Sequence, residues 1–158
     1  MLQRIQSIFL FLVFILAILV YFTNFSTANI ADPNPGSYYL DVTSIYRLTT
    51  HTPDVIQPLY WLTLINGFNG ILAFFTIFLY KNRLQQIKLS RFGLILTLIL
   101  IVLIFFYSEQ MTSLPGAEAQ VNYLWGAILP ILQLLFYFMA IRNIKRDEAL
   151  VRSADRLR

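Results

Sequence analysis

Four long stretches without Asp, Glu, Lys or Arg constrain the fold of this chain more than any other feature. They cover residues 5–31, 55–80, 92–108 and 119–141 and are between 17 and 27 residues long. A helix needs roughly 20 apolar residues to cross a bilayer, so each stretch has room for one crossing. We therefore expect an all-α membrane protein, a bundle of four transmembrane helices near residues 5–24, 57–80, 92–108 and 120–141.

The composition agrees with this prediction, because 58% of the residues are apolar and soluble domains are nearer ~45–50%. Four helices use most of the 158 residues. We expect one integral membrane domain over residues 1–158, with a single outer loop of about 30 residues and a tail over residues 142–158. The absence of cysteine excludes disulfides, thiolate nucleophiles and cysteine-bound metals.

The placement of the basic residues explains the net charge of +4. Four crossings put both termini on the same side, and every Lys and Arg except Arg47 then lies on that side. Cytoplasmic loops carry the excess of Lys and Arg, so we expect both termini in the cytoplasm. Aromatic rings favour the headgroup level, and they mark the outer ends at Tyr21, Tyr60, Trp61, Tyr107, Tyr123 and Trp125.

The second stretch carries small and polar residues inside an apolar segment. At ~100° per residue, Asn66, Asn69 and Gly70 fall on one side of a helix. Helices in lipid associate through small residues and interhelical hydrogen bonds, so these residues are candidates for helix packing or for lining a ligand site. The third stretch is apolar on every side, which predicts contact mainly with lipid.

The fourth stretch repeats the pattern of the second. Gly126, Pro130, Gln133 and Tyr137 recur at intervals of three or four residues on one helix face and are candidates for the same roles. We expect this face to meet the second helix, with Gln133 at nearly the depth of Asn69. The two amides then bond to each other or each to a different partner. Pro130 predicts a kink near mid-bilayer.

The outer loop, residues 25–56, contains a turn-forming D-P-N-P-G cluster, and the alternation around Tyr38 and Leu40 permits a short strand. A hairpin and a short helix on the outer face both remain open. The loop also holds the only histidine, His51, with Asp54 nearby. Metal sites need a closer group of ligands, so we interpret His51 as a solvated loop residue.

Two basic segments flank the predicted helices. The loop KNRLQQIKLSR favours a topology signal facing anionic headgroups, and docking of an acidic or nucleic-acid partner is the alternative. The tail IRNIKRDEALVRSADRLR is amphipathic when continued as a helix, which predicts a helix at the cytoplasmic interface or on a partner. Its candidate docking residues are Lys145, Arg146, Arg152 and Arg156.

The opening MLQRIQSIFL, the basic loop and above all the ending AIRNIKRDEALVRSADRLR resemble a family of small bacterial inner-membrane proteins, domain of unknown function 4293. The resemblance covers the whole chain and is most specific at the ending. It implies four transmembrane helices in the inner membrane of a Gram-negative bacterium. It implies no activity, cofactor or site residues.

Among functions, the sequence favours a non-catalytic accessory or structural subunit of a larger inner-membrane assembly. The alternative is a binding or transport module for a small hydrophobic molecule, a lipid or a quinone, between the second and fourth helices. An enzyme is disfavoured because acid-base or nucleophilic work needs titratable groups gathered in one place. We expect no catalytic residue, no cofactor and no metal, with the lipid bilayer and other membrane subunits as partners.

Overall fold

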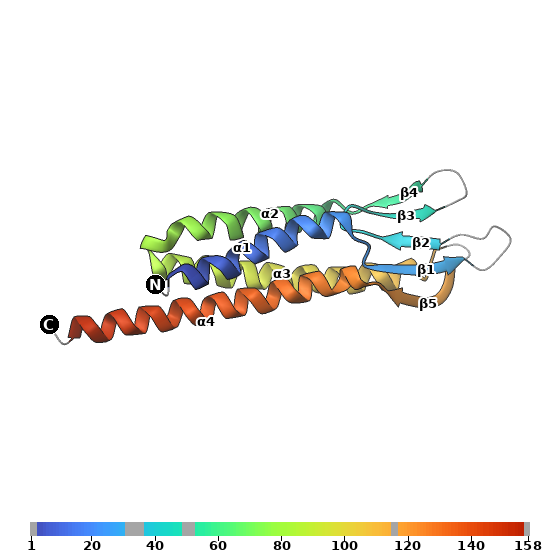
Figure 1. The fold of residues 1–158 in the computed structure, drawn as a ribbon. Coiled ribbons are helices and arrows are strands. Elements are labelled where there is room, and N and C mark those ends of the chain that lie inside the picture. Colours follow the sequence, from blue (N-terminus) through green and yellow to red (C-terminus); the bar gives the residue numbers. More distant parts are fainter. Residues whose placement is uncertain (1–2, 31–36, 49–52, 115–116, 157–158) are drawn as a thin grey trace.

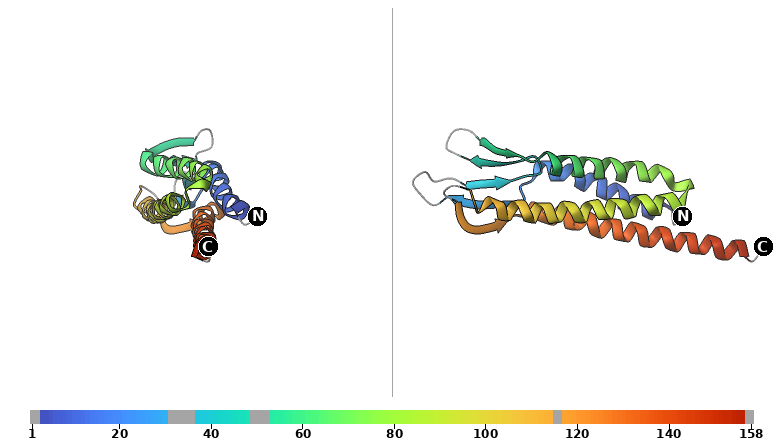
Figure 2. Two further views of the ribbon diagram at one scale, coloured as in Figure 1. Left: turned by 90° about the vertical axis from the view of Figure 1, so that its left-hand side faces the viewer. Right: turned by 180° about the vertical axis from the view of Figure 1, so that it is seen from behind.

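The computed structural model describes residues 3–30, 37–48, 53–114 and 117–156. Four helices lie side by side and a sheet extends from one end of them (Figure 1). Both chain ends lie at the opposite end of the helices (Figure 2). The helices are α1 (Gln3–Leu19), α2 (Tyr60–Phe78), α3 (Arg83–Met111) and α4 (Ile128–Arg156).

The sheet corrects the prediction of an all-α protein. Its five antiparallel strands stand in the order β4-β3-β2-β1-β5. Four of them occupy the predicted outer loop, and the fifth lies in the stretch that we expected to begin the fourth helix. The strands are β1 (Ser26–Ile30), β2 (Ser37–Leu40), β3 (Ser44–Leu48), β4 (Pro53–Pro58) and β5 (Ala117–Tyr123).

Alternation of side chains explains why these segments form strands. Leu40 pairs with Ile45 in the ladder, and both side chains are buried. Their neighbours Tyr39 and Tyr46 pair on the opposite face, where the rings stack with centroids 5.5 Å apart. Between β2 and β3, the Asp41 carboxylate accepts hydrogen bonds from the backbone N–H groups of Thr43 and Ser44, which fixes the hairpin turn.

The helix boundaries also differ from those predicted. The helix α2 begins after Pro58, which ends β4, and α3 begins within the basic loop, where the Asn82 side chain accepts a hydrogen bond from the Gln85 N–H. The expected tail is the second half of α4 and not a separate segment. Pro130 lies in the first turn of α4, where a missing N–H removes no helical bond. The predicted mid-bilayer kink at Pro130 is therefore wrong.

Each helix packs against two neighbours. The helices α1 and α3 both contact α2 and α4, so α2 and α4 stand on a diagonal. One core cluster lies where the sheet meets the helices and includes Phe25, Leu40 and Leu100. A second lies further toward the chain termini and includes Leu10 and Tyr137. The sheet and the helices thus share a continuous packed junction.

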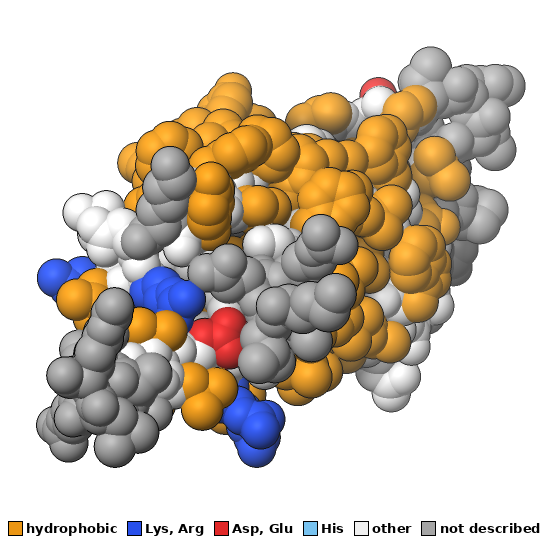
Figure 3. All heavy atoms as spheres, turned by 60° about the vertical axis from the view of Figure 1, so that its left-hand side comes forward, with side chains coloured by type: hydrophobic (Ala, Val, Ile, Leu, Met, Phe, Trp, Pro, Cys, Tyr) orange, Lys and Arg blue, Asp and Glu red, His pale blue; other side chains and the backbone are white. Residues whose placement is uncertain are grey.

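Three described helices are long and apolar enough to cross a membrane, Tyr60–Phe78, Arg83–Met111 and Trp125–Val151. A further apolar helix, Gln6–Phe22, is shorter. Hydrophobic side chains cover the sides of the helices, and Lys and Arg side chains gather toward the end that carries the termini (Figure 3). This distribution is that of helices surrounded by hydrocarbon, with their charges at one end.

Candidate functional site

A chain of buried hydrogen bonds links three helices at the centre of the helical region. The Tyr137 hydroxyl of α4 donates to Asn69 Oδ1 of α2 over 2.9 Å. Asn69 Nδ2 donates to Thr97 Oγ1 of α3 over 2.9 Å, and Thr97 Oγ1 donates to the Gly93 carbonyl. We call Asn69, Gly93, Thr97 and Tyr137 the central network. It connects the diagonal helices α2 and α4 through the middle of the fold.

The other candidates on α2 join it to α1. Asn66 Nδ2 donates to the Ala17 carbonyl over 2.9 Å. A Cβ added at Gly70 would lie 3.0 Å from the Ala17 Cβ, so glycine permits the close approach of the two backbones. The predicted packing role of the α2 face is consistent with these contacts.

Gln133 does not bond to Asn69, whose side-chain oxygen accepts from Tyr137 instead. The Gln133 side chain is 0% exposed, and neither its Nε2 nor its Oε1 has a hydrogen-bond partner among the described residues. Asn66 Oδ1 is also buried without a described partner. An unpaired buried amide costs roughly 1–3 kcal/mol in proteins. Ser90 Oγ of α3 likewise lacks a partner, but among the described residues only Gln133 leaves both of its side-chain polar atoms unpaired, which packing alone does not explain.

Sequence reasoning missed the contribution of α3. Ser90, Gly93 and Thr97 are fully or largely buried and recur at intervals of three and four residues, a signal that the apolar surroundings concealed. A Cβ at Gly93 would lie 2.5 Å from the Tyr137 ring, so only glycine leaves room for the central network. The expected lipid contact fits α3 as a whole, because 28% of the residues in its apolar span are buried, compared with 39% in the span of α2.

Gly126 lies in a short 3₁₀ turn, Trp125–Ala127, and not on the face of α4. A Cβ there would lie 2.2 Å from the Asn24 carbonyl oxygen. Nearby, the Leu124 N–H donates to the Phe25 carbonyl over 2.8 Å. Gly126 is thus a residue of the junction between sheet and helices.

The strand β4 forms one edge of the sheet and presents apolar side chains. Val55 is 62% exposed and Ile56 is 45% exposed. Val55 also borders a hollow of about 400 Å³ together with Tyr46 and Leu48. Burial raises the pKa of the Tyr46 hydroxyl. The hydrogen bond to Asn24 lowers this pKa and the nearby Asp41 carboxylate raises it, with a net increase. The hydroxyl therefore stays protonated and a donor at neutral pH. We call Leu48, Val55 and Ile56 the β4 patch.

The helix end that carries the termini is polar. The buried Asp147 carboxylate accepts a hydrogen bond from Gln6, and Arg83 donates to the Asp147 carbonyl over 3.0 Å. Of the candidate docking residues, Lys145 and Arg146 are exposed on α4. The candidates Arg152 and Arg156 belong to α4, but their side chains lie outside the described residues.

No group of His, Asp and Glu that could hold a metal occurs among the described residues. His51 lies outside them. The described side chains thus supply hydrogen-bonding groups inside the helices, an apolar strand edge and a basic end, but no cluster of titratable residues that suggests a reaction.

Long apolar helices with an apolar outer surface indicate the class of helical membrane proteins. Within this class, the family model of a domain of unknown function, DUF4293, matches residues 2–157. The chain belongs to this family, which confirms the resemblance seen in the sequence. A search of curated proteins found no match.

Proposed function

We propose that this chain is a multi-pass protein of the bacterial inner membrane that performs no catalysis and serves as an accessory or structural subunit of a larger membrane assembly. The use of Asn66, Asn69 and Tyr137 supports a structural role, because these side chains bond other helices. Because these side chains are used inside the protein, a partner would bind the outer surface of the chain.

Four crossings are supported by length. At ~1.5 Å per residue the 17 residues of α1 extend about 26 Å. The 3₁₀ turn Val20–Phe22 adds about 6 Å, which brings this helix to the ~30 Å of a hydrocarbon core. The 19 residues of α2 extend about 29 Å, and the 3₁₀ turn Leu79–Lys81 adds about 6 Å. The helices α3 and α4, with 29 residues each, exceed the thickness of the core. Four crossings put both termini on one side.

The charges and the sheet support an orientation with both termini in the cytoplasm. The basic side chains of α3 and α4 lie at the end opposite the sheet. A sheet with open edges is not found in hydrocarbon, so the strands belong in water on the outer side. Exposed aromatic side chains mark the plane between the two regions at Phe22, Tyr60, Trp61, Tyr123 and Trp125.

The observation that carries the subunit proposal is the β4 patch. An edge strand presents backbone groups to which another chain can add. The apolar Val55 and Ile56 lie on this edge. At ~3.3 Å per residue, Val55 lies up to about 16 Å from Tyr60, the first residue of α2, on the side away from the membrane. Exposed apolar side chains on a strand outside the membrane are characteristic of a surface that a partner covers.

Affinity purification of the tagged chain from native membranes in mild detergent tests this proposal. We expect a companion protein in fixed stoichiometry with the wild type, lost from the Val55→Glu/Ile56→Glu variant because two charges oppose burial of the patch. The matched control, Gln120→Glu/Asn122→Glu, changes two exposed residues of the other edge strand and should retain the companion. A wild-type chain that purifies alone contradicts the subunit proposal.

A second candidate, a binding module for a small hydrophobic molecule with a polar group, is favoured by Gln133 alone. A bound carbonyl or hydroxyl would pair its free amide. In the same purification, this candidate predicts an extra mass of lipid or quinone size on the wild type and its loss from Gln133→Leu. If the role of Gln133 is only structural, the wild type and Gln133→Leu should purify with the same bound mass, or both with none. Gln133→Leu should then be at least as stable as the wild type, because it removes an unpaired buried amide.

A further inference from the structure

A groove of about 320 Å³ between α3 and α4 gathers positive charge near the helix end that carries the termini. Lys88 and Arg91 line it from α3, and Lys145 lines it from α4. One carboxylate, Glu148, also lines the groove. Three cations and one carboxylate leave a net positive charge, which an anionic occupant would neutralise.

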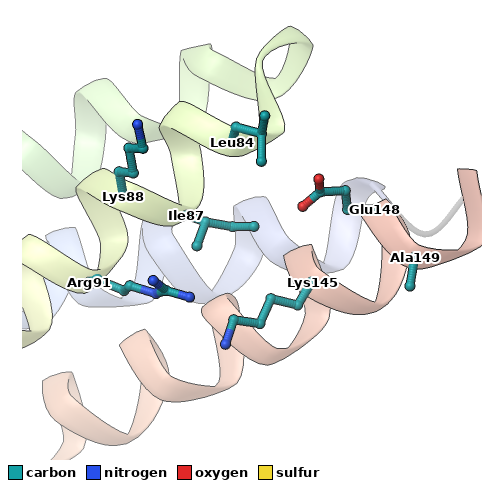
Figure 4. Close-up of a pocket in the computed structure, with 7 residues that line it drawn as sticks. All are labelled: Leu84, Ile87, Lys88, Arg91, Lys145, Glu148 and Ala149. Atoms are coloured by element: carbon teal, nitrogen blue, oxygen red, sulfur yellow. The ribbon is translucent and has the colours of Figure 1, made fainter. Parts of the chain in front are cut away.

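The three cations lack partners among the described residues. Arg91 extends from α3 toward α4 and Lys145 extends from α4 toward α3, so their charged ends occupy the same gap (Figure 4). No hydrogen bond or ion pair joins Lys88, Arg91 or Lys145 to any other described residue. Like charges that share a gap repel each other. An anion bound between Arg91 and Lys145 would convert this repulsion into two attractive contacts.

The rest of the groove is apolar. Leu84 and the buried Ile87 line it beside the cations. Such a lining fits poorly with a nucleic acid or an acidic peptide, which would bring polar groups against it. An occupant with a charged group and a hydrocarbon part satisfies both sides of the groove.

The helix faces above the cations continue as apolar surface toward the middle of the membrane. Leu98 and Val102 lie seven and eleven residues beyond Arg91, and Phe138 and Ile131 lie seven and fourteen residues before Lys145. At ~100° per residue these separations keep each side chain within about 40° of its cation. All four are 45–65% exposed. The two helices therefore present an apolar track that begins at the charged groove.

We propose that the groove is a binding site for one anionic phospholipid, with the phosphodiester between Arg91 and Lys145 and the acyl chains along the track. Basic pockets between transmembrane helices on the cytoplasmic side hold anionic headgroups in the same way. The site rests on the proposed insertion of the helices in a bilayer with this end at the cytoplasmic interface. It assigns Arg91 and Lys145 a role beyond orienting the chain.

Native mass spectrometry of the delipidated protein in detergent tests the site. We expect dioleoyl phosphatidylglycerol to bind the wild type and dioleoyl phosphatidylcholine to bind far less. Arg91→Gln/Lys145→Gln should weaken phosphatidylglycerol binding roughly 30-fold, the effect of two cations at a membrane surface. Arg142→Gln/Arg146→Gln, which removes two exposed cations outside the groove, should bind as the wild type does. Inorganic phosphate, which lacks acyl chains, should not compete at millimolar concentration.

The conservative variant Arg91→Lys/Lys145→Arg keeps both charges and should keep the lipid, which separates loss of charge from loss of fold. Equal binding of the two lipids, or equal phosphatidylglycerol binding by wild type and Arg91→Gln/Lys145→Gln, would overturn the site. Membrane fractionation of the same cells separates the two proposals. A chain absent from membranes refutes the proposed function, whereas a membrane-inserted chain without lipid preference refutes only this site.

Discussion

Replacing Gly126 with alanine should lower the free energy of unfolding by at least about 3 kcal/mol, the upper range for overpacking a buried site. The new Cβ would lie 2.2 Å from the Asn24 carbonyl oxygen and 3.0 Å from the Thr23 Cβ. Asn24 contributes backbone there, so no side-chain rotation relieves the contact. The strands β1 and β5 must separate from the helices, or the turn before α4 must move.

Thermal unfolding in detergent, followed by the fluorescence of the two tryptophans, measures this effect, since Trp125 adjoins the site. Gly67→Ala is the matched control. Its Cβ would meet only the hydroxyl of Tyr21, 3.0 Å away at the end of an exposed side chain, and the helix gains from losing a glycine. If Gly126→Ala and Gly67→Ala unfold at the same temperature, the described junction is wrong.

Gly93→Ala should have the next largest effect, a loss of about 1–3 kcal/mol from overpacking. The added Cβ would lie 2.5 Å from both Cζ and the hydroxyl oxygen of Tyr137. Because Tyr137 is fully buried, its ring has little room to move, and a shift would break its bond to Asn69. That bond is worth a further ~0.5–2 kcal/mol in a membrane.

A double-mutant cycle tests the cause. Gly93→Ala and Tyr137→Ala should together cost less than the sum of their separate effects, with a coupling of about 1–3 kcal/mol, because the smaller side chain makes room for the Cβ. Gly93→Ala combined with Tyr137→Phe should show a smaller coupling of ~0.5–2 kcal/mol, because Tyr137→Phe removes the bond to Asn69 beforehand while the ring carbon stays at 2.5 Å. Additive costs in the first pair would mean that the two residues do not touch.

The helices could be predicted from the sequence because uncharged stretches of this length have few other solutions. The sheet could be foreseen only in part. The alternation around Tyr38 and Leu40 permitted the strand that β2 forms, but a short helix remained open there, and the stretch 119–141 resembles one apolar run. Its first residues, 119–123, belong to the strand β5, and the helical turns begin only at Trp125. Absence of charge is shared by a membrane helix and by a strand beside it, so charge alone placed the boundary of α4 too early.

The candidate residues were predicted in part. The α2 and α4 faces do contain the residues that connect helices, but their partners depend on helix rotation, which a single sequence does not define. Tyr137 reaches across the diagonal to Asn69, where Gln133 was an expected partner. Thr97 and Gly93 complete the network from a helix whose polar residues are sparse. The available signal was one polar or small residue in each turn of the first half of α3, at Ser90, Gly93 and Thr97.

The central claim is that the helices cross a membrane with the sheet outside and the termini inside. Because the chain contains no cysteine, single cysteines report on each side without background. We expect a membrane-impermeant maleimide to label Asn122→Cys on β5 in intact spheroplasts, and to label Gln85→Cys on α3 only after the membrane is permeabilised. Equal labelling of both positions in intact spheroplasts, or labelling of Gln85→Cys alone, would contradict the account.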